Sequence, residues 1–157
     1  MAAITQISRQ PAFFGEGRVA DTLEGRLEVM TLHACLALMR IARDEKLAPL
    51  GQAFADVLFR HFDAGLREAG VGDTAVPKRM RKIAGSFYGR LDAYAAALAA
   101  PESGPLGDAI ARNMLGVDEA PPYAAILSAY VRATATAQAP APVDALFRLD
   151  GWQPAPA

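Results

Sequence analysis

Two histidines and one cysteine are the residues of this sequence whose chemistry could support metal binding or catalysis. His33 and Cys35 lie two positions apart in a segment of helical apolar spacing, which places them roughly 200° apart around a helix, so they cannot share one ion. His61 could approach His33 from the next helix, but two histidines without a carboxylate at ligand spacing are weak evidence for zinc. We therefore expect no metal, and we favour a buried core hydrogen bond for His33 over a ligand or catalytic role.

Two short motifs resemble parts of enzymes but lack the required context. Residues 70–75 read GVGDTA, which fits the loose dinucleotide-binding pattern G-x-G-x-x-A. That pattern has its function between a strand and a helix, and here a helix precedes it, so we interpret the glycines as a helix stop and a tight turn. Ser86 lies in AGSFYG, which lacks the G-x-S-x-G arrangement of a nucleophile. We expect no catalytic residues and no cofactor.

Positive charge is concentrated at the predicted start of a helix. The basic patch consists of four cations within five residues, namely Lys78, Arg79, Arg81 and Lys82. Cations at a helix N-terminus each lose about 0.3–1 kcal/mol against the helix dipole, and this cost suggests a function. One interpretation is a solvated turn paired with Asp73, Glu68 or acids elsewhere. The other is a docking site for an anionic partner, such as an acidic protein surface, a phospholipid headgroup layer or ribosomal RNA.

The composition predicts helices rather than strands. Of the 157 residues, 34 are alanine, the best helix former, and only 8% are aromatic. The formal net charge of −1 argues against a nucleic-acid-binding domain, so no DNA partner is expected. The single cysteine excludes an internal disulfide. No apolar run reaches the ~18 residues of a membrane span, and the N-terminus lacks the apolar region of a secretory signal, which predicts a cytoplasmic protein.

Apolar residues spaced three and four apart predict a series of helices. Residues 22–44 carry two apolar faces and are expected to form the central helix, with Asp21 or Thr22 as its cap. Longer helices are expected over 49–70 and 77–100, and shorter ones after Pro105 and after the Pro121–Pro122 pair. The buried face of the 49–70 helix is predicted to contain Leu50, Phe54, Val57, Leu58, Phe62 and Leu66. The predicted fold is all-α, a single compact domain of about five to six helices with no β-sheet.

Composition along the chain suggests three segments. Residues 1–19 form an N-terminal segment in which no amphipathic helix is predicted, and residues 20–133 form the helical domain. Residues 134–157 are an Ala/Pro-rich tail that is expected to bury little, apart from a short docking segment around Trp152. Phe13, Phe14 and Trp152 are interpreted as apolar staples that close over the core.

Two stretches of the sequence resemble a known family. DTLEGRLEVMTLHACLALMRI (21–41) and LREAGVGDTAVPKRMRKIAGSFYGRLDAY (66–94) are similar to the ubiquinol–cytochrome c chaperone family, assembly factors for respiratory complex III, in a bacterial form. The resemblance covers residues 20–131, with Thr74 and Leu27 as departures from the pattern. Its motif residues, interpreted as structural, are Gly25, Arg26, His33, Gly72, Asp73, Pro77, Tyr88, Gly89 and Arg90.

The resemblance implies an all-helical protein without a catalytic centre that binds newly made cytochrome b or another complex III subunit. The basic patch adds partners beyond the client to this expectation: an anionic surface of the inner membrane, with peripheral attachment there, or the ribosome. The resemblance is compatible with a protein that acts alone, as a homodimer or together with another factor. The alternative function is a helical RNA- or ribosome-binding module that uses the basic patch at 78–82.

The motif residues suggest structural roles within the helices. Gly25 and Gly89 each cost about 1 kcal/mol relative to alanine inside a helix, so we expect close helix approach at both, and destabilisation by Gly89→Leu. The following arginines, Arg26 and Arg90, are expected to reach carboxylates on a neighbouring helix, with Asp21 or Glu24 as the predicted partner of Arg90. Charge reversal at Lys78 and Lys82 is expected to spare folding and damage function.

Overall fold

Helix α2 (Leu23–Ile41) lies at the centre of this computed structural model, which describes residues 1–102 and 104–156. Its two apolar faces are both covered, since Leu32 and Ala34 lie about 160° apart around the helix and both are fully buried. The Thr22 hydroxyl caps the helix by accepting a hydrogen bond from the Gly25 amide at 3.1 Å. The predicted central helix is confirmed, although it ends three residues early and Asp44 caps a short 3-10 turn (Glu45–Leu47) instead.

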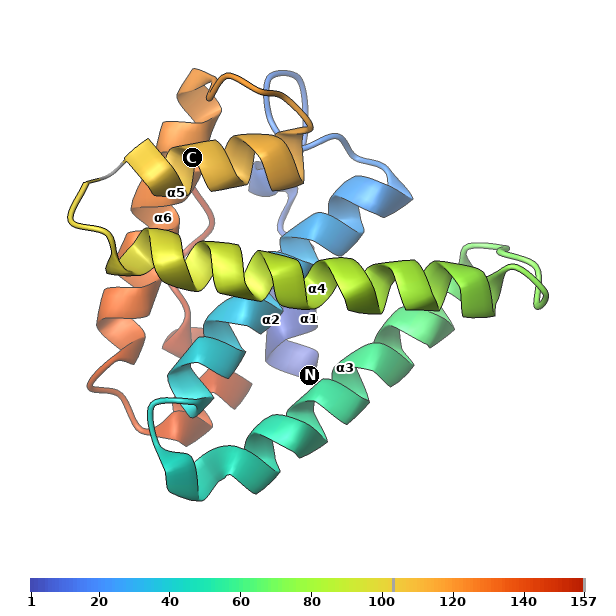
Figure 1. Ribbon diagram of the computed structural model, residues 1–157, viewed down its shortest axis with the longest axis horizontal. Coiled ribbons are helices and arrows are strands. Elements are labelled where there is room, and N and C mark those ends of the chain that lie inside the picture. Colours follow the sequence, from blue (N-terminus) through green and yellow to red (C-terminus); the bar gives the residue numbers. More distant parts are fainter. Residues whose placement is uncertain (103, 157) are drawn as a thin grey trace.

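Five further α-helices pack around α2. They are α1 (Ala2–Ser8), α3 (Ala48–Glu68), α4 (Val76–Ala99), α5 (Gly104–Ile110) and α6 (Pro122–Gln138). Figure 1 shows that α4 crosses in front of α2, and that α3 and α4 diverge from the loop that joins them. The all-α prediction is confirmed, because the described residues contain six α-helices and no strand.

The predicted start and stop signals of the long helices are also in place. Gly70 adopts a left-handed backbone with φ of 80°, and the Val71 amide donates to the Leu66 carbonyl at 3.0 Å, which closes the end of α3. Pro77 lies in the first turn of α4. The predicted burial of Val57 is wrong, because this side chain is 39% exposed. It lies about 120° from the centre of the stripe formed by Phe54, Leu58, Phe62 and Leu66.

The N-terminal segment contributes to the core. Helix α1 packs on α2 and buries Ile4 and Ile7, and Phe13 at the end of a 3-10 turn (Pro11–Phe13) is fully buried. The expectation that this segment lacks an amphipathic helix is therefore wrong. A seven-residue helix has little stability of its own, so α1 is stabilised by its packing against α2. The staple interpretation of Phe13 is confirmed.

The C-terminal segment also folds onto the domain. Helix α6 continues through the expected boundary at residue 133, with Thr134 and Gln138 buried, because the returning chain covers this end of the helix. Gln138 donates to the Gly151 carbonyl at 3.3 Å. Trp152 docks as predicted: it is buried, and its indole N–H donates to the Leu146 carbonyl at 3.1 Å.

Candidate functional site

His33 is a structural residue at the centre of the core. Its Nδ1 lies 2.7 Å from the Val29 carbonyl and 3.1 Å from the Ser8 hydroxyl, and its Nε2 lies 2.8 Å from the Tyr130 hydroxyl. A carbonyl can only accept, so Nδ1 carries the proton and Nε2 accepts from Tyr130. Burial lowers the pKa of His33 to about 4, against a smaller opposing effect of the Val29 hydrogen bond. The predicted buried hydrogen bond is thus confirmed.

The second histidine does not join the first. His61 Nε2 is 3.5 Å from the Thr5 hydroxyl, and burial, with a smaller effect of Arg9, lowers its pKa. Within residues 1–102 and 104–156, no three or more His, Cys, Asp and Glu side chains are grouped closely enough to hold a metal ion. The Cys35 thiol is buried beside α4 and burial raises its pKa. His33 and Cys35 are thus fully buried, and His61 is partly exposed.

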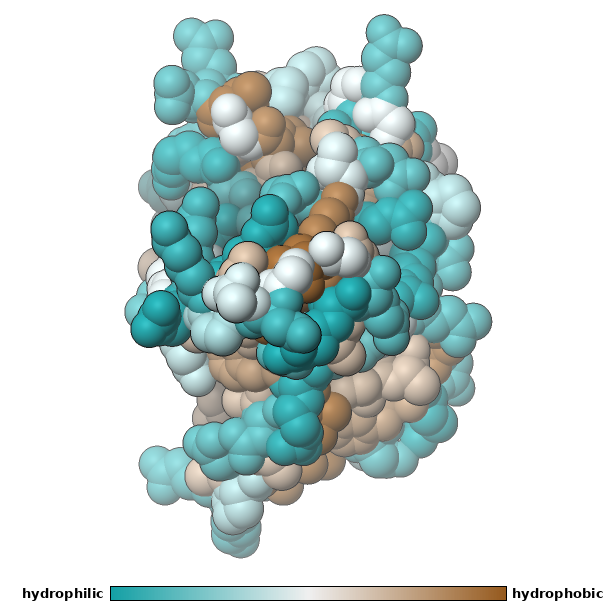
Figure 2. Space-filling view, turned by 90° about the vertical axis from the view of Figure 1, so that its right-hand side faces the viewer, coloured by the Kyte–Doolittle hydropathy of each residue, from teal (hydrophilic) through white to brown (hydrophobic). Residues whose placement is uncertain are grey.

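The basic patch occupies the first turns of α4, and all four of its side chains are exposed. Arg79 lies 3.6 Å from Glu24 of α2, and the described residues show no ion pair for Lys78, Arg81 or Lys82. Of the pairing interpretation, only a contact with an acid elsewhere is found, between Arg79 and Glu24; Asp73 pairs with Arg67 instead. Figure 2 shows the side of the molecule on which the α3–α4 loop lies, where hydrophilic side chains cover most of the surface. The patch is therefore a positive surface with little internal neutralisation.

An apolar groove lies further along α4 from the patch, between the middle of α4, the end of α2 and the N-terminal half of α3. Its volume is about 590 Å³. The end of α2 forms one wall of this α4 groove. Its main apolar lining residues are Leu38, Met39, Ile41, Ala55, Tyr88 and Leu91. No lysine or arginine lines it, and Asp44 and Glu45 lie at the α2–α3 end.

Tyr88 gives this groove an accessible aromatic wall. The side chain is 52% exposed, although its ring lies 5.5 Å from Phe87 and 6.3 Å from Phe59, centroid to centroid. Tyr88 follows Lys82 by six residues, or about 9 Å along the helix. A cationic surface and an apolar groove therefore lie on one helix, about 9 Å apart along its axis. The sequence motif identified Tyr88 but not its groove, because the groove depends on the angle between two helices.

Arg90 makes the principal polar contact between α4 and α2. Its Nε and Nη2 donate to the two carboxylate oxygens of Glu28 at 2.7 and 2.5 Å, and both side chains are mostly buried. Burial raises the pKa of Glu28, and the Arg90 charge opposes that change. The predicted partners Asp21 and Glu24 are wrong for Arg90. The expected cross-helix role is correct, with the acid one helical turn further along α2.

Removal of Arg90 will leave the Glu28 carboxylate partly buried without its partner. For Arg90→Met we expect the unfolding free energy to fall by about 2 kcal/mol, measured by urea denaturation. Glu28→Gln in the same protein should recover part of that loss, because it removes the unpaired charge. If the double variant is no more stable than Arg90→Met, the loss arises from packing of the arginine stem and not from the charge.

The remaining motif residues divide between local structure and surface. Arg26 pairs with Asp21 at 2.6 Å, just before its own helix, so the expected cross-helix partner is wrong. A Cβ on Gly25 would lie 2.0 Å from the Ala20 carbonyl oxygen, so the expected close approach exists, but to the preceding chain and not to another helix. Gly89 is exposed, and a Cβ added there would meet no other segment within 4 Å, so close helix approach at Gly89 is wrong.

The α3–α4 loop holds the last of the motif residues. Gly72, Asp73 and Pro77 are all exposed, with Asp73 held by Arg67 and Pro77 in the first turn of α4. They determine how α4 begins, and so where the basic patch lies. No helix of the described residues is both long and apolar enough to cross a membrane.

Comparison with known proteins identifies the same family along most of the chain. The family model described as ubiquinol-cytochrome C chaperone matches residues 16–150. No curated protein matches. The crystal structure of the Cbp3 homolog from Brucella abortus has a TM-score of 0.79 and 39% sequence identity, covering 95% of this chain and 83% of that one. The family match and the shared fold together show that the chain belongs to the ubiquinol–cytochrome c chaperone family.

Proposed function

We propose that this protein binds newly made cytochrome b and supports assembly of the ubiquinol–cytochrome c reductase complex. Membership of the chaperone family supports a role in assembly of that complex. The observation that carries the proposal is the α4 surface, where the basic patch and the apolar α4 groove lie on the same helix. This surface can bind a partner without any catalytic step.

The two parts of the surface suit different parts of a membrane-protein client. The groove offers Met39, Leu91 and the ring of Tyr88 to an apolar client segment, which is shielded from other chains while it is bound. The exposed cations of the patch suit an acidic client loop or an anionic lipid surface beside the client. If the patch binds anionic lipid, the protein contacts the inner membrane peripherally.

Charge reversal at Lys78 and Lys82 will separate function from folding. Acidic side chains near a helix N-terminus interact favourably with the dipole, so we expect Lys78→Glu/Lys82→Glu to melt at or above the wild-type temperature. In a strain that lacks the gene, we expect this variant to restore less than a third of the cytochrome b and of the antimycin-sensitive quinol–cytochrome c reductase activity that wild type restores.

The matched control is Arg60→Glu/Arg112→Glu, which makes the same change in net charge at two exposed positions outside the patch. We expect it to restore both signals fully. Full rescue by the Lys78/Lys82 variant would remove the patch from the mechanism. Normal complex III in the strain without the gene would contradict the assembly role itself.

The unpaired cations of the patch also support a second candidate function, contact with ribosomal RNA. Such binding weakens steeply with salt, with a slope set by the number of phosphates that are neutralised. Binding of the purified protein to RNA, lost in the Lys78/Lys82 variant while complex III assembly stays normal, would favour this candidate over the client-binding one.

A further inference from the structure

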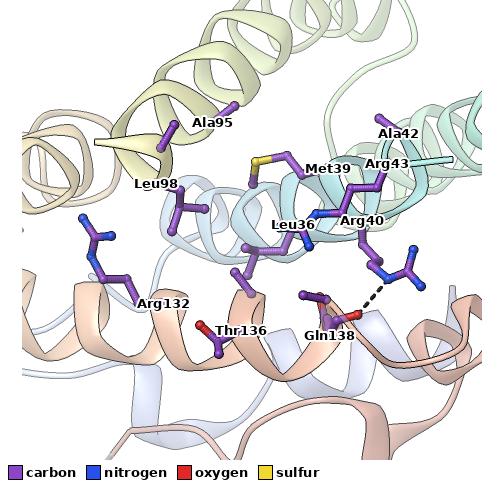
Figure 3. A pocket seen from close by; sticks show the side chains of 13 residues that line it. Leu36, Met39, Arg40, Ala42, Arg43, Ala95, Leu98, Arg132, Thr136 and Gln138 are labelled. Atoms are coloured by element: carbon purple, nitrogen blue, oxygen red, sulfur yellow. Dashed lines mark hydrogen bonds between the residues drawn. The ribbon is translucent and has the colours of Figure 1, made fainter. Parts of the chain in front are cut away.

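A second groove lies between α2, α4 and α6, beside the α4 groove, with which it shares Met39, Ala42 and Ala95. Its volume is about 680 Å³, within the range of small-molecule sites. Figure 3 shows Leu36, Met39 and Leu98 in the middle, with Arg132 towards one end and Arg40 and Arg43 towards the other. We name it the arginine groove. No acidic side chain lines it.

Two arginines of this groove, Arg40 and Arg132, are held by backbone carbonyls and not by carboxylates. Arg40 donates from Nε to the Gln138 carbonyl at 2.7 Å and from Nη2 to the Ala141 carbonyl. Arg132 donates from Nη2 to the Glu102 carbonyl at 2.8 Å and to that of Ala97 at 3.3 Å. Carbonyls orient a guanidinium without neutralising it, so the positive charge remains.

Some N–H donors of the groove's arginines have no hydrogen-bond partner. The Nε of Arg132 is buried and has no hydrogen-bond partner within the described residues. The same residues show no ion pair or hydrogen bond for the side chain of Arg43. By contrast, Arg26, Arg67, Arg90 and Arg148 all pair with carboxylates. The arginine groove therefore contains three guanidinium groups that have no carboxylate partner among the described residues.

We propose that the arginine groove binds a single-chain amphiphilic anion, a carboxylate on an acyl chain. The apolar residues between the arginines suit the chain, and a guanidinium binds a carboxylate through paired N–H donors. Arg43 is exposed and unpaired, and so is the arginine best able to turn towards the head group. This site goes beyond the proposed function and shares none of the basic patch.

The test is calorimetric titration of the purified full chain with laurate below its micelle concentration. Acetate supplies the head group without the chain, and dodecanol supplies the chain without the charge. We expect laurate to bind at least about tenfold more tightly than either, because only laurate uses both features of the groove. Equal binding of dodecanol, or no binding of laurate, would overturn the proposal.

Variants locate the binding and keep it distinct from the proposed function. Arg43→Glu should weaken laurate about tenfold or more, and Thr136→Trp, which places a large side chain at an exposed groove position, should abolish binding. Arg60→Glu, and Lys78→Glu/Lys82→Glu in the basic patch, should bind laurate as wild type does. Unchanged melting temperatures confirm that each variant is folded.

Phospholipid vesicles test whether the arginines bind a membrane surface instead of a single-chain anion. If the groove takes a single-chain anion, Arg43→Glu should leave sedimentation of the protein with phosphatidylglycerol vesicles unchanged. Loss of vesicle sedimentation in Arg43→Glu would assign the arginines to a membrane surface and would contradict a single-chain site.

Discussion

Gly25→Ala will destabilise the protein by about 3 kcal/mol, the upper range for an overpacked core position. The added Cβ would lie 2.0 Å from the Ala20 carbonyl oxygen and 3.1 Å from Val19. That carbonyl also accepts the Thr22 amide at 2.8 Å, and Thr22 caps α2. The clash therefore reaches the cap of the central helix. Thermal unfolding should show a fall of roughly 6–12 °C.

The matched control is the same substitution at Gly89, where the space around a Cβ is open. Alanine is a better helix former than glycine by about 1 kcal/mol, so Gly89→Ala should raise the melting temperature by roughly 2–4 °C. The expected result is that alanine lowers the melting temperature at Gly25 and raises it at Gly89. A similar loss of stability at both would show that Gly89 has a packing role, as its place in the motif first suggested.

Acidification will destabilise the fold through His33. An unfolded histidine has a pKa near 6.5, whereas burial lowers the pKa of His33 in the folded state to about 4. Between these values the unfolded state binds more protons, so stability present above pH 6.5 is lost as the pH falls towards 4. We expect a loss of about 2 kcal/mol between pH 7 and pH 5 from this residue, measured by urea denaturation at each pH.

The variant His33→Gln provides the reference, because its side chain does not titrate. It will be less stable than wild type at pH 7, since the hydrogen bonds with Val29 and Tyr130 are altered, but its stability should change less with pH. His61, whose pKa is also lowered by burial, is present in both proteins and cancels in the difference. Equal pH dependence in the two proteins would mean that His33 is accessible to protons in the folded state.

Sequence patterns predicted those features that arise from neighbouring residues. The starts of α2 and α4, the stop at Gly70 and the all-α class follow from capping, proline and glycine chemistry within a few residues. The burial of His33 and the docking of Trp152 were also predicted, because apolar surroundings at helical spacing favour the interior.

Errors arose where a residue's environment depends on a distant segment. Arg90 and Glu28 are 62 residues apart, and only the rotation of α4 against α2 decides which acid the arginine meets. Gly25 and Gly89 each precede an arginine in a predicted helix, yet one lies against the preceding chain and the other against solvent. Helix α1 and the end of α6 are ordered by the surfaces that cover them.

For the two candidate binding surfaces too, the sequence predicted the local features and the tertiary structure was needed for the rest. Local sequence was sufficient to predict the helices, the cations of the basic patch and the family motif, because helix propensity, capping and charge are properties of residues within one or two turns. The packing of the helices was needed to show that Tyr88 borders a groove, and that Arg40, Arg43 and Arg132 surround another without a carboxylate. Grooves exist between helices, and the packing angles and helix rotations that create them follow from the whole core at once.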